Sequence, residues 1–98
     1  MHRRHLALLD ELDARGLLDL VDDLCRRRGV LRRELLGRHR TRGVVRARHE
    51  LWWLLRHDPE RTYSLPELAR LFDRDHTTIL AGVAAHASRQ RCGTSPNP

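Results

Sequence analysis

The sequence predicts an all-helical fold, a compact bundle of about five to six helices, and three observations lead to this expectation. Apolar residues recur at spacings of three and four along much of the chain, as they do on one face of a helix. Leucine and arginine dominate the composition, whereas strand-favouring residues are scarce. Hydrophobic residues make up 40% and aromatic residues 4% of the 98 residues, so the core is expected to consist mainly of leucine, valine and alanine. A chain of this length forms one domain with a modest core.

The amino-terminal half contains three predicted helices. Leucines within residues 8–12 share one helix face, and apolar residues within 17–24 share another. Gly16 lies between these two runs and Gly29 follows the second, as expected for glycines that end helices. A third, short helix is predicted over residues 31–36.

The carboxyl-terminal half contains three more predicted helices. Residues 44–57 place apolar side chains on one face and form the longest of them, which ends before a proline. Ser64 and Glu67 have the spacing of a capping box, so the next helix begins after Ser64. Asp75 caps the last helix, which ends where a polar and disordered tail, residues 88–98, begins. The two last helices and their tight turn together form a helix-turn-helix.

The last helix has one face suited to a DNA groove. At about 100° per residue, Ile79, Val83 and Ala87 fall on the side predicted to face the core, with Leu80 beside them. Small residues on the other side let a helix sit deep in the major groove, where a threonine methyl packs on a thymine methyl and Asp75 accepts from a cytosine amino group. This outer face comprises Thr77, Thr78, Ala81, Gly82 and Ala85. His76 projects near the apolar side, so a DNA contact and a structural role are both open for it.

Positive charge is concentrated in the middle of the chain. Residues 26–48 hold ten arginines and one acid, Glu34, whereas residues 1–25 and 49–87 each hold more acids than arginines. An arginine-rich composition alone would not gather the charge in one segment, so this patch predicts a polyanionic partner. All 19 basic residues are arginine, which excludes a P-loop and a Schiff-base lysine.

Within this patch, residues 38–43 lack apolar side chains and are predicted to form an extended basic loop. Extended arginine-bearing arms enter the minor groove beside many helix-turn-helix motifs. The first turns of the following helix can reach phosphates or base edges, and position alone does not assign either contact. The candidate contacts in this segment are Arg38, Arg40, Arg42, Arg46, Arg48 and His49.

Three stretches resemble the carboxyl-terminal DNA-binding domain of DnaA, the bacterial chromosomal replication initiator. They are LLGRHRTRGVVRAR at 35–48, SLPEL at 64–68 and RDHTTIL at 74–80. The resemblance spans residues 30–87 and implies an all-α domain that binds DnaA-box-type duplex sites with a helix in the major groove and a basic loop in the minor groove. It also implies that Arg40 is the minor-groove arginine and that Arg48 contacts DNA. The major-groove side chains implied in the same way are those of Asp75, His76, Thr77 and Thr78. Arg74, which begins the RDHTTIL stretch, is a further candidate DNA contact.

The chain departs from the DnaA pattern at several positions. Ala47 replaces the usual proline and His49 the usual glutamine, and the turn 72–74 is one residue short and lacks glycines. The target is therefore expected to differ from the standard DnaA box. The family's ATPase domain is missing from the sequence, so we expect residues 17–87 to act as a standalone domain. Such a domain would regulate replication initiation or transcription by occupying its sites.

Several other classes of function are not expected. The seven histidines are scattered without zinc-site spacing, and no catalytic constellation is recognisable, so we expect no metal, no other cofactor, no bound nucleotide and no enzyme activity. Cys25 and Cys92 form no CxxC pair, which fits a reducing compartment. Without a membrane-spanning stretch or a signal sequence, the predicted location is the cytoplasm, in association with the nucleoid.

A protein-interaction module, or a nonspecific nucleic-acid binder, is the alternative function. In this interpretation the amino-terminal helix over residues 1–16, the acidic helix after it and Trp53 dock on another protein. Trp52 flanks the apolar stripe of its helix and is expected in the core. Trp53 points away, so it either packs under the amino-terminal helix or anchors a protein partner.

Overall fold

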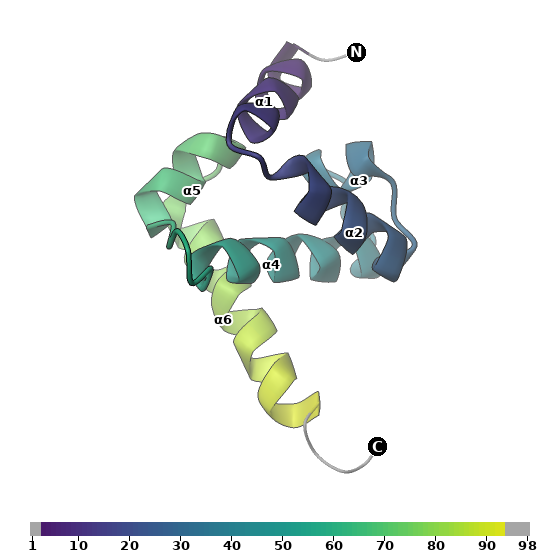
Figure 1. Cartoon of the computed structure of the whole chain (residues 1–98). Helices are drawn as coiled ribbons and strands as arrows, with labels where there is room; N and C mark the ends of the chain where they lie inside the picture. Colours follow the sequence, from purple (N-terminus) through teal and green to yellow (C-terminus); the bar gives the residue numbers. More distant parts are fainter. Residues whose placement is uncertain (1–2, 94–98) are drawn as a thin grey trace. The chain divides into compact units, whose positions relative to one another are not determined.

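The computed structural model describes residues 3–93, and over this range it contains six α-helices and no strand (Figure 1). This confirms the predicted all-helical fold and the predicted number of helices. The chain divides into two compact units, residues 1–48 and 49–98, and the division falls inside the fourth helix. The helices are α1 (Arg3–Ala14), α2 (Leu18–Arg28), α3 (Arg32–Leu36), α4 (Arg42–Arg56), α5 (Leu65–Phe72) and α6 (His76–Gly93).

The first unit comprises α1, α2, α3 and the first turns of α4. Helix α1 contacts α2 and α3, and α2 also contacts α3. Gly16 and Gly29 adopt the left-handed backbone that glycine tolerates best, with φ of 72° and 67°, and they separate α1 from α2 and α2 from α3 as predicted. The buried hydrophobic residues of this unit are Leu8, Leu12, Leu17, Val21, Leu24, Leu35, Leu36, Val44 and Ala47.

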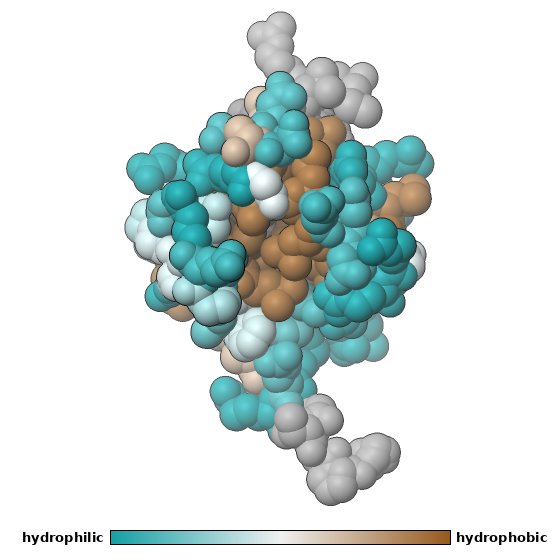
Figure 2. All heavy atoms as spheres, in the orientation of Figure 1, coloured by the Kyte–Doolittle hydropathy of each residue, from teal (hydrophilic) through white to brown (hydrophobic). Residues whose placement is uncertain are grey.

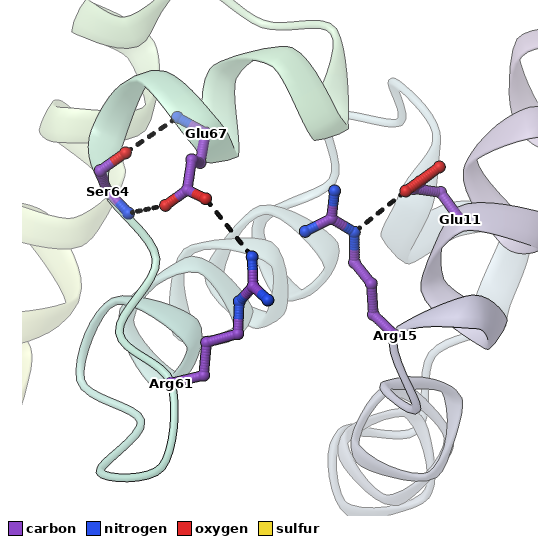
Figure 3. A network of polar contacts seen from close by, with 5 residues as sticks. All are labelled: Glu11, Arg15, Arg61, Ser64 and Glu67. Atoms are coloured by element: carbon purple, nitrogen blue, oxygen red, sulfur yellow. Dashed lines mark hydrogen bonds and ion pairs between the residues drawn. The ribbon is translucent and has the colours of Figure 1, made fainter.

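Ion pairs join charged side chains within the first unit. The Arg32 guanidinium at the start of α3 donates to both carboxylate oxygens of Asp22 in α2, with Nη2–O distances of 2.7 Å. A forked pair of this kind fixes the relative orientation of both side chains. At the end of α1, Arg15 donates to Glu11 at 3.2 Å, one helical turn earlier (Figure 3).

The second unit comprises the rest of α4, α5 and α6, and α5 contacts α6. The predicted capping box is confirmed: the Ser64 hydroxyl accepts from the Glu67 N–H at 3.2 Å, and the Glu67 carboxylate accepts from the Ser64 N–H at 2.9 Å (Figure 3). Arg61 donates to the same carboxylate at 3.5 Å. The buried hydrophobic residues of this unit are Leu51, Trp52, Leu55, Tyr63, Leu68, Phe72 and Ile79.

The last helix is longer than the sequence suggested. It was expected to end near residue 87 before a disordered tail, but α6 continues to Gly93. Residues 88–91 include no glycine or proline that would stop a helix. In addition, Arg89 Nη2 lies 3.3 Å from His49 Nδ1, which holds this part of α6 to α4 within the second unit. The remaining tail, residues 94–98, lies outside the described residues.

Hydrophilic residues cover much of the face seen in Figure 2, in keeping with a charged fraction of 33%. Among the described residues, no helix combines the length and the apolar character needed to cross a bilayer.

Candidate nucleic-acid interface

Helices α5 and α6 form a helix-turn-helix within the second unit, joined by the turn 73–75. Asp73 adopts the left-handed backbone conformation, with φ 54° and ψ 52°, and is the one described non-glycine residue with a positive φ. Its N–H donates to the carbonyls of Ala69 and Arg70 at the end of α5, and the Arg74 N–H donates to Ala69 at 2.9 Å. Main-chain hydrogen bonds therefore close this short turn without the glycine that such a position favours.

The tip of α6, residues 75–78, faces solvent. The Asp75 carbonyl accepts from the N–H groups of Thr78 and Ile79, at 2.9 and 3.2 Å, and so begins the helix. The side chains of Asp75 and His76 are 72% and 65% exposed, and a carboxylate oxygen of Asp75 lies 3.9 Å from Nδ1 of His76. Thr77 and Thr78 are exposed as well. All four side chains thus lie on the surface, and the structural role left open for His76 finds no support.

The buried face of α6 differs from the predicted one. Leu80 was expected in the core but is 50% exposed, whereas Gly82, expected on the outer face, is buried. A Cβ atom at Gly82 would stand 2.6 Å from Trp52 Cε3 and 2.8 Å from His49 Cδ2. Gly82 therefore lets α6 approach α4 closely, and the helix is rotated relative to the prediction. Its buried stripe is Ile79, Gly82 and His86, and its exposed stripe is Thr77, Leu80, Ala81, Ala84 and Ser88.

Two of the predicted DNA contacts are partly enclosed within the second unit. The Arg74 guanidinium carbon lies 5.8 Å from the Trp52 ring centroid, a cation–π arrangement, and Arg74 is half-buried. The His49 ring lies 5.8 Å from the Trp52 ring and, as described above, bonds Arg89. Both residues therefore support the packing of the helix-turn-helix, a role that the sequence did not predict for them.

The basic segment lies in the first unit and is shorter as a loop than predicted. The Val45 N–H donates to the Thr41 carbonyl at 2.9 Å, so α4 already begins at Arg42 and the loop is confined to residues 37–41. Residues 42 and 43, which were expected in the loop, are helical because this bond starts the helix. The four exposed arginines of the segment, hereafter the basic ridge, are Arg38, Arg40, Arg42 and Arg46.

Several arginines outside the basic ridge are paired with nearby carboxylates. Arg26 and Arg27 both form ion pairs with Asp23, at 3.4 and 3.0 Å, and Arg32 is bound by Asp22. The hydrogen bond from Arg27 is the main reason why the pKa of Asp23 lies below its ordinary value. Among the described residues, by contrast, no carboxylate forms an ion pair with the ridge residues Arg40, Arg42 or Arg46.

Arg48 is not on the basic ridge, although the sequence placed it among the DNA contacts. It is only 5% exposed. Its Nε donates to the Leu35 carbonyl at 2.9 Å and its Nη2 to the Glu34 carbonyl at 2.8 Å. Both acceptors lie near the carboxyl end of α3, where helix carbonyls lack intrahelical partners. The structure thus gives Arg48 a buried role within the first unit.

The two tryptophans of α4 differ in burial, and the prediction for Trp52 is confirmed. Trp52 is 1% exposed and belongs to the core. Trp53 is half-buried, with its ring stacked on His57 at 4.5 Å and tilted against His86 at 5.3 Å. Sequence reasoning missed His86, which is 5% exposed; its spacing of seven residues from Ile79 was the available signal.

Comparisons with known proteins identify one family. The model of the bacterial DnaA protein helix-turn-helix matches residues 19–85, about two thirds of the chain. The matched range includes both the basic ridge and the helix-turn-helix. A search of curated proteins found no match, and a search of solved structures found none either.

Proposed function

The chain belongs to the bacterial DnaA helix-turn-helix family, and we propose that it is a sequence-specific binder of double-stranded DNA. Domains of this family bind DNA and are not catalytic. The observation that carries the proposal is the exposed tip of α6, where four hydrogen-bonding side chains, residues 75–78, stand at the start of the second helix of a helix-turn-helix. That end of a recognition helix is the part that contacts base edges.

We assign sequence preference to the tip of α6. Asp75 can accept from a cytosine amino group, and the threonines can pack their methyl groups on thymine or exchange hydrogen bonds with other bases. Next along the exposed stripe, Leu80 adds an apolar surface and Ala81 and Ala84 add little bulk. The proposed targets are DnaA-box-like, with a sequence altered by the departures noted above.

We assign most of the affinity to the basic ridge. Its arginines are exposed, and three of them have no carboxylate partner among the described residues, so a phosphate would not have to displace one. Each neutralised phosphate releases condensed counterions, which makes such binding strongly salt-dependent. Arg40 is the proposed minor-groove arginine, by resemblance to the family. We further propose that the protein regulates replication initiation or transcription by occupying its sites.

The test begins with selection of bound sequences from a random duplex library, followed by titrations of selected and random duplexes at two salt concentrations. Binding that prefers one sequence and survives moderate salt is the expected result. Weak binding to any polyanion, without preference, would contradict the proposal. That outcome would favour the alternative protein-interaction module.

Two variants test whether the basic ridge supplies affinity and the tip of α6 supplies sequence preference. Arg40→Ala should weaken binding to both duplexes and reduce the slope of log K against log salt by about 0.9, the value for one phosphate. Thr77→Ala should lower the ratio of specific to random affinity by about 5- to 150-fold, which corresponds to 1–3 kcal/mol. Arg33→Ala, which removes an exposed arginine outside the ridge, and Ser88→Ala, far along α6, are the matched controls. Equal losses on both duplexes for Thr77→Ala would refute this division.

A further inference from the structure

We infer that Arg48 governs DNA binding from inside the first unit, as a positioning residue that holds the loop 37–41 in shape. The inference rests on the proposed function, since it assigns Arg48 a part in that binding. It differs from what the family resemblance implies, namely a direct contact between Arg48 and DNA.

The hydrogen bonds of Arg48 join the two helices that flank the loop. Helix α3 ends at Leu36, and Arg48 lies six residues after Arg42, the first residue of α4. The guanidinium donates from Nε and Nη2 to the carbonyls of Leu35 and Glu34, at 2.9 and 2.8 Å. Carbonyls at a helix end carry a partial negative charge, so a buried cation is well placed there. One side chain thereby ties the end of α3 to α4.

The tied segment carries part of the basic ridge. Arg38 and Arg40 both lie in the five-residue loop between the two helices. The loop leaves α3 through a turn so tight that a Cβ atom at Gly37 would stand 2.6 Å from the Arg33 carbonyl oxygen. If the tie is lost, the loop regains conformational freedom that must be given up again on binding, and affinity falls.

Within α4, one arginine faces solvent and another is buried. Arg46 is exposed, whereas Arg48, two residues later, is 5% exposed and directed at α3. A phosphate accepts a lysine ammonium as a point charge, so lysine would largely replace an arginine that binds phosphate. Two carbonyls bridged by adjacent donors of one planar group require the arginine fork. The response to lysine therefore distinguishes a positioning role from a phosphate contact.

The first test measures affinity for a selected duplex with Arg48→Lys, Arg48→Met, Arg40→Ala and the double variant Arg40→Ala/Arg48→Met. Both Arg48 variants should lose at least about fivefold in affinity, in the range of one good contact, without recovery in the lysine variant. The double variant should lose clearly less affinity than the product of the two single losses, because Arg40 contributes less once its loop is no longer held. Recovery with lysine, or losses that multiply in the double variant, would overturn the inference.

The second test needs no DNA. Amide hydrogen exchange over residues 37–41 should be faster in both Arg48 variants than in the wild-type protein, because the loop is released. Exchange in α5 and α6 and the helical circular dichroism should stay unchanged, which controls for general unfolding. Unaltered exchange in the loop would also overturn the inference. If the wild-type protein prefers no duplex, the proposed function fails, and the exchange experiment still decides whether Arg48 holds the loop.

Discussion

Gly82 determines how closely α6 approaches α4 in the second unit, and its replacement by alanine gives the sharpest test of this packing. The added Cβ would stand 2.6 and 2.8 Å from two carbon atoms of the Trp52 ring and 2.8 Å from Cδ2 of His49. Carbon atoms pack best at about 3.5–4.0 Å, so each contact is short by roughly 1 Å. His49 is half-buried and can shift, but the Trp52 ring is 1% exposed and is enclosed on other sides by Phe72 and Arg74.

The expected magnitude follows from two opposing terms. Forcing an extra carbon into a packed core costs about 1–3 kcal/mol, and the rigid ring places this case in the upper half of that range. Alanine in place of glycine inside a helix gains about 1 kcal/mol. The net prediction for Gly82→Ala is a loss of about 1–2 kcal/mol in the free energy of unfolding, with the melting temperature falling by about 4–8 °C for each kcal/mol.

The assay is urea denaturation followed by circular dichroism and tryptophan fluorescence. Ala84→Gly, at an exposed site of the same helix, measures the propensity term by itself and is the matched control. The strain at Gly82 is then the loss of unfolding free energy in Gly82→Ala plus the loss in Ala84→Gly. If Gly82→Ala stabilises the protein by as much as Ala84→Gly destabilises it, the strain is zero, Trp52 moves aside without cost, and the packing argument is wrong.

Two further predictions concern the same helix-turn-helix. Ile79→Ala should lower the free energy of unfolding by about 2–5 kcal/mol and Leu80→Ala by only about 0.5 kcal/mol, because Ile79 is buried and Leu80 is half exposed. Comparable losses for the two variants in urea denaturation would contradict the observed rotation of α6. Asp73→Gly should be more stable than Asp73→Ala by about 1 kcal/mol, since both lose the carboxylate but only alanine keeps a Cβ at a positive φ; equal melting temperatures would refute this.

The helices were predictable because their signals are local. The spacing of Ser64 and Glu67 encodes a capping box within four residues, and Gly16 and Gly29 end helices through their own backbone freedom. The exposed tip of α6 was predictable for the same reason, since the polar run Asp75-His-Thr-Thr78 marks a helix start. Such features need no knowledge of distant partners.

The errors concern residues whose environment is set by distant parts of the chain. Arg48 looks like a surface arginine until the carbonyls of α3, 13 and 14 residues earlier, are placed beside it. Gly82 looks like part of a smooth outer face, but its missing side chain makes room for Trp52. Hydrophobicity alone placed Leu80 in the core, because periodicity over a short helix leaves its rotation uncertain by one position.

The turn between α5 and α6 has a consequence for how a protein of this kind can diversify. Its hydrogen bonds run between backbone atoms, from Asp73 and Arg74 to the carbonyls of Ala69 and Arg70, so the side chain of Asp75 takes no part in them. A change of that side chain therefore leaves these hydrogen bonds of the turn in place. Evolution can therefore exchange the chemistry presented at the helix tip while the scaffold that carries it is inherited intact.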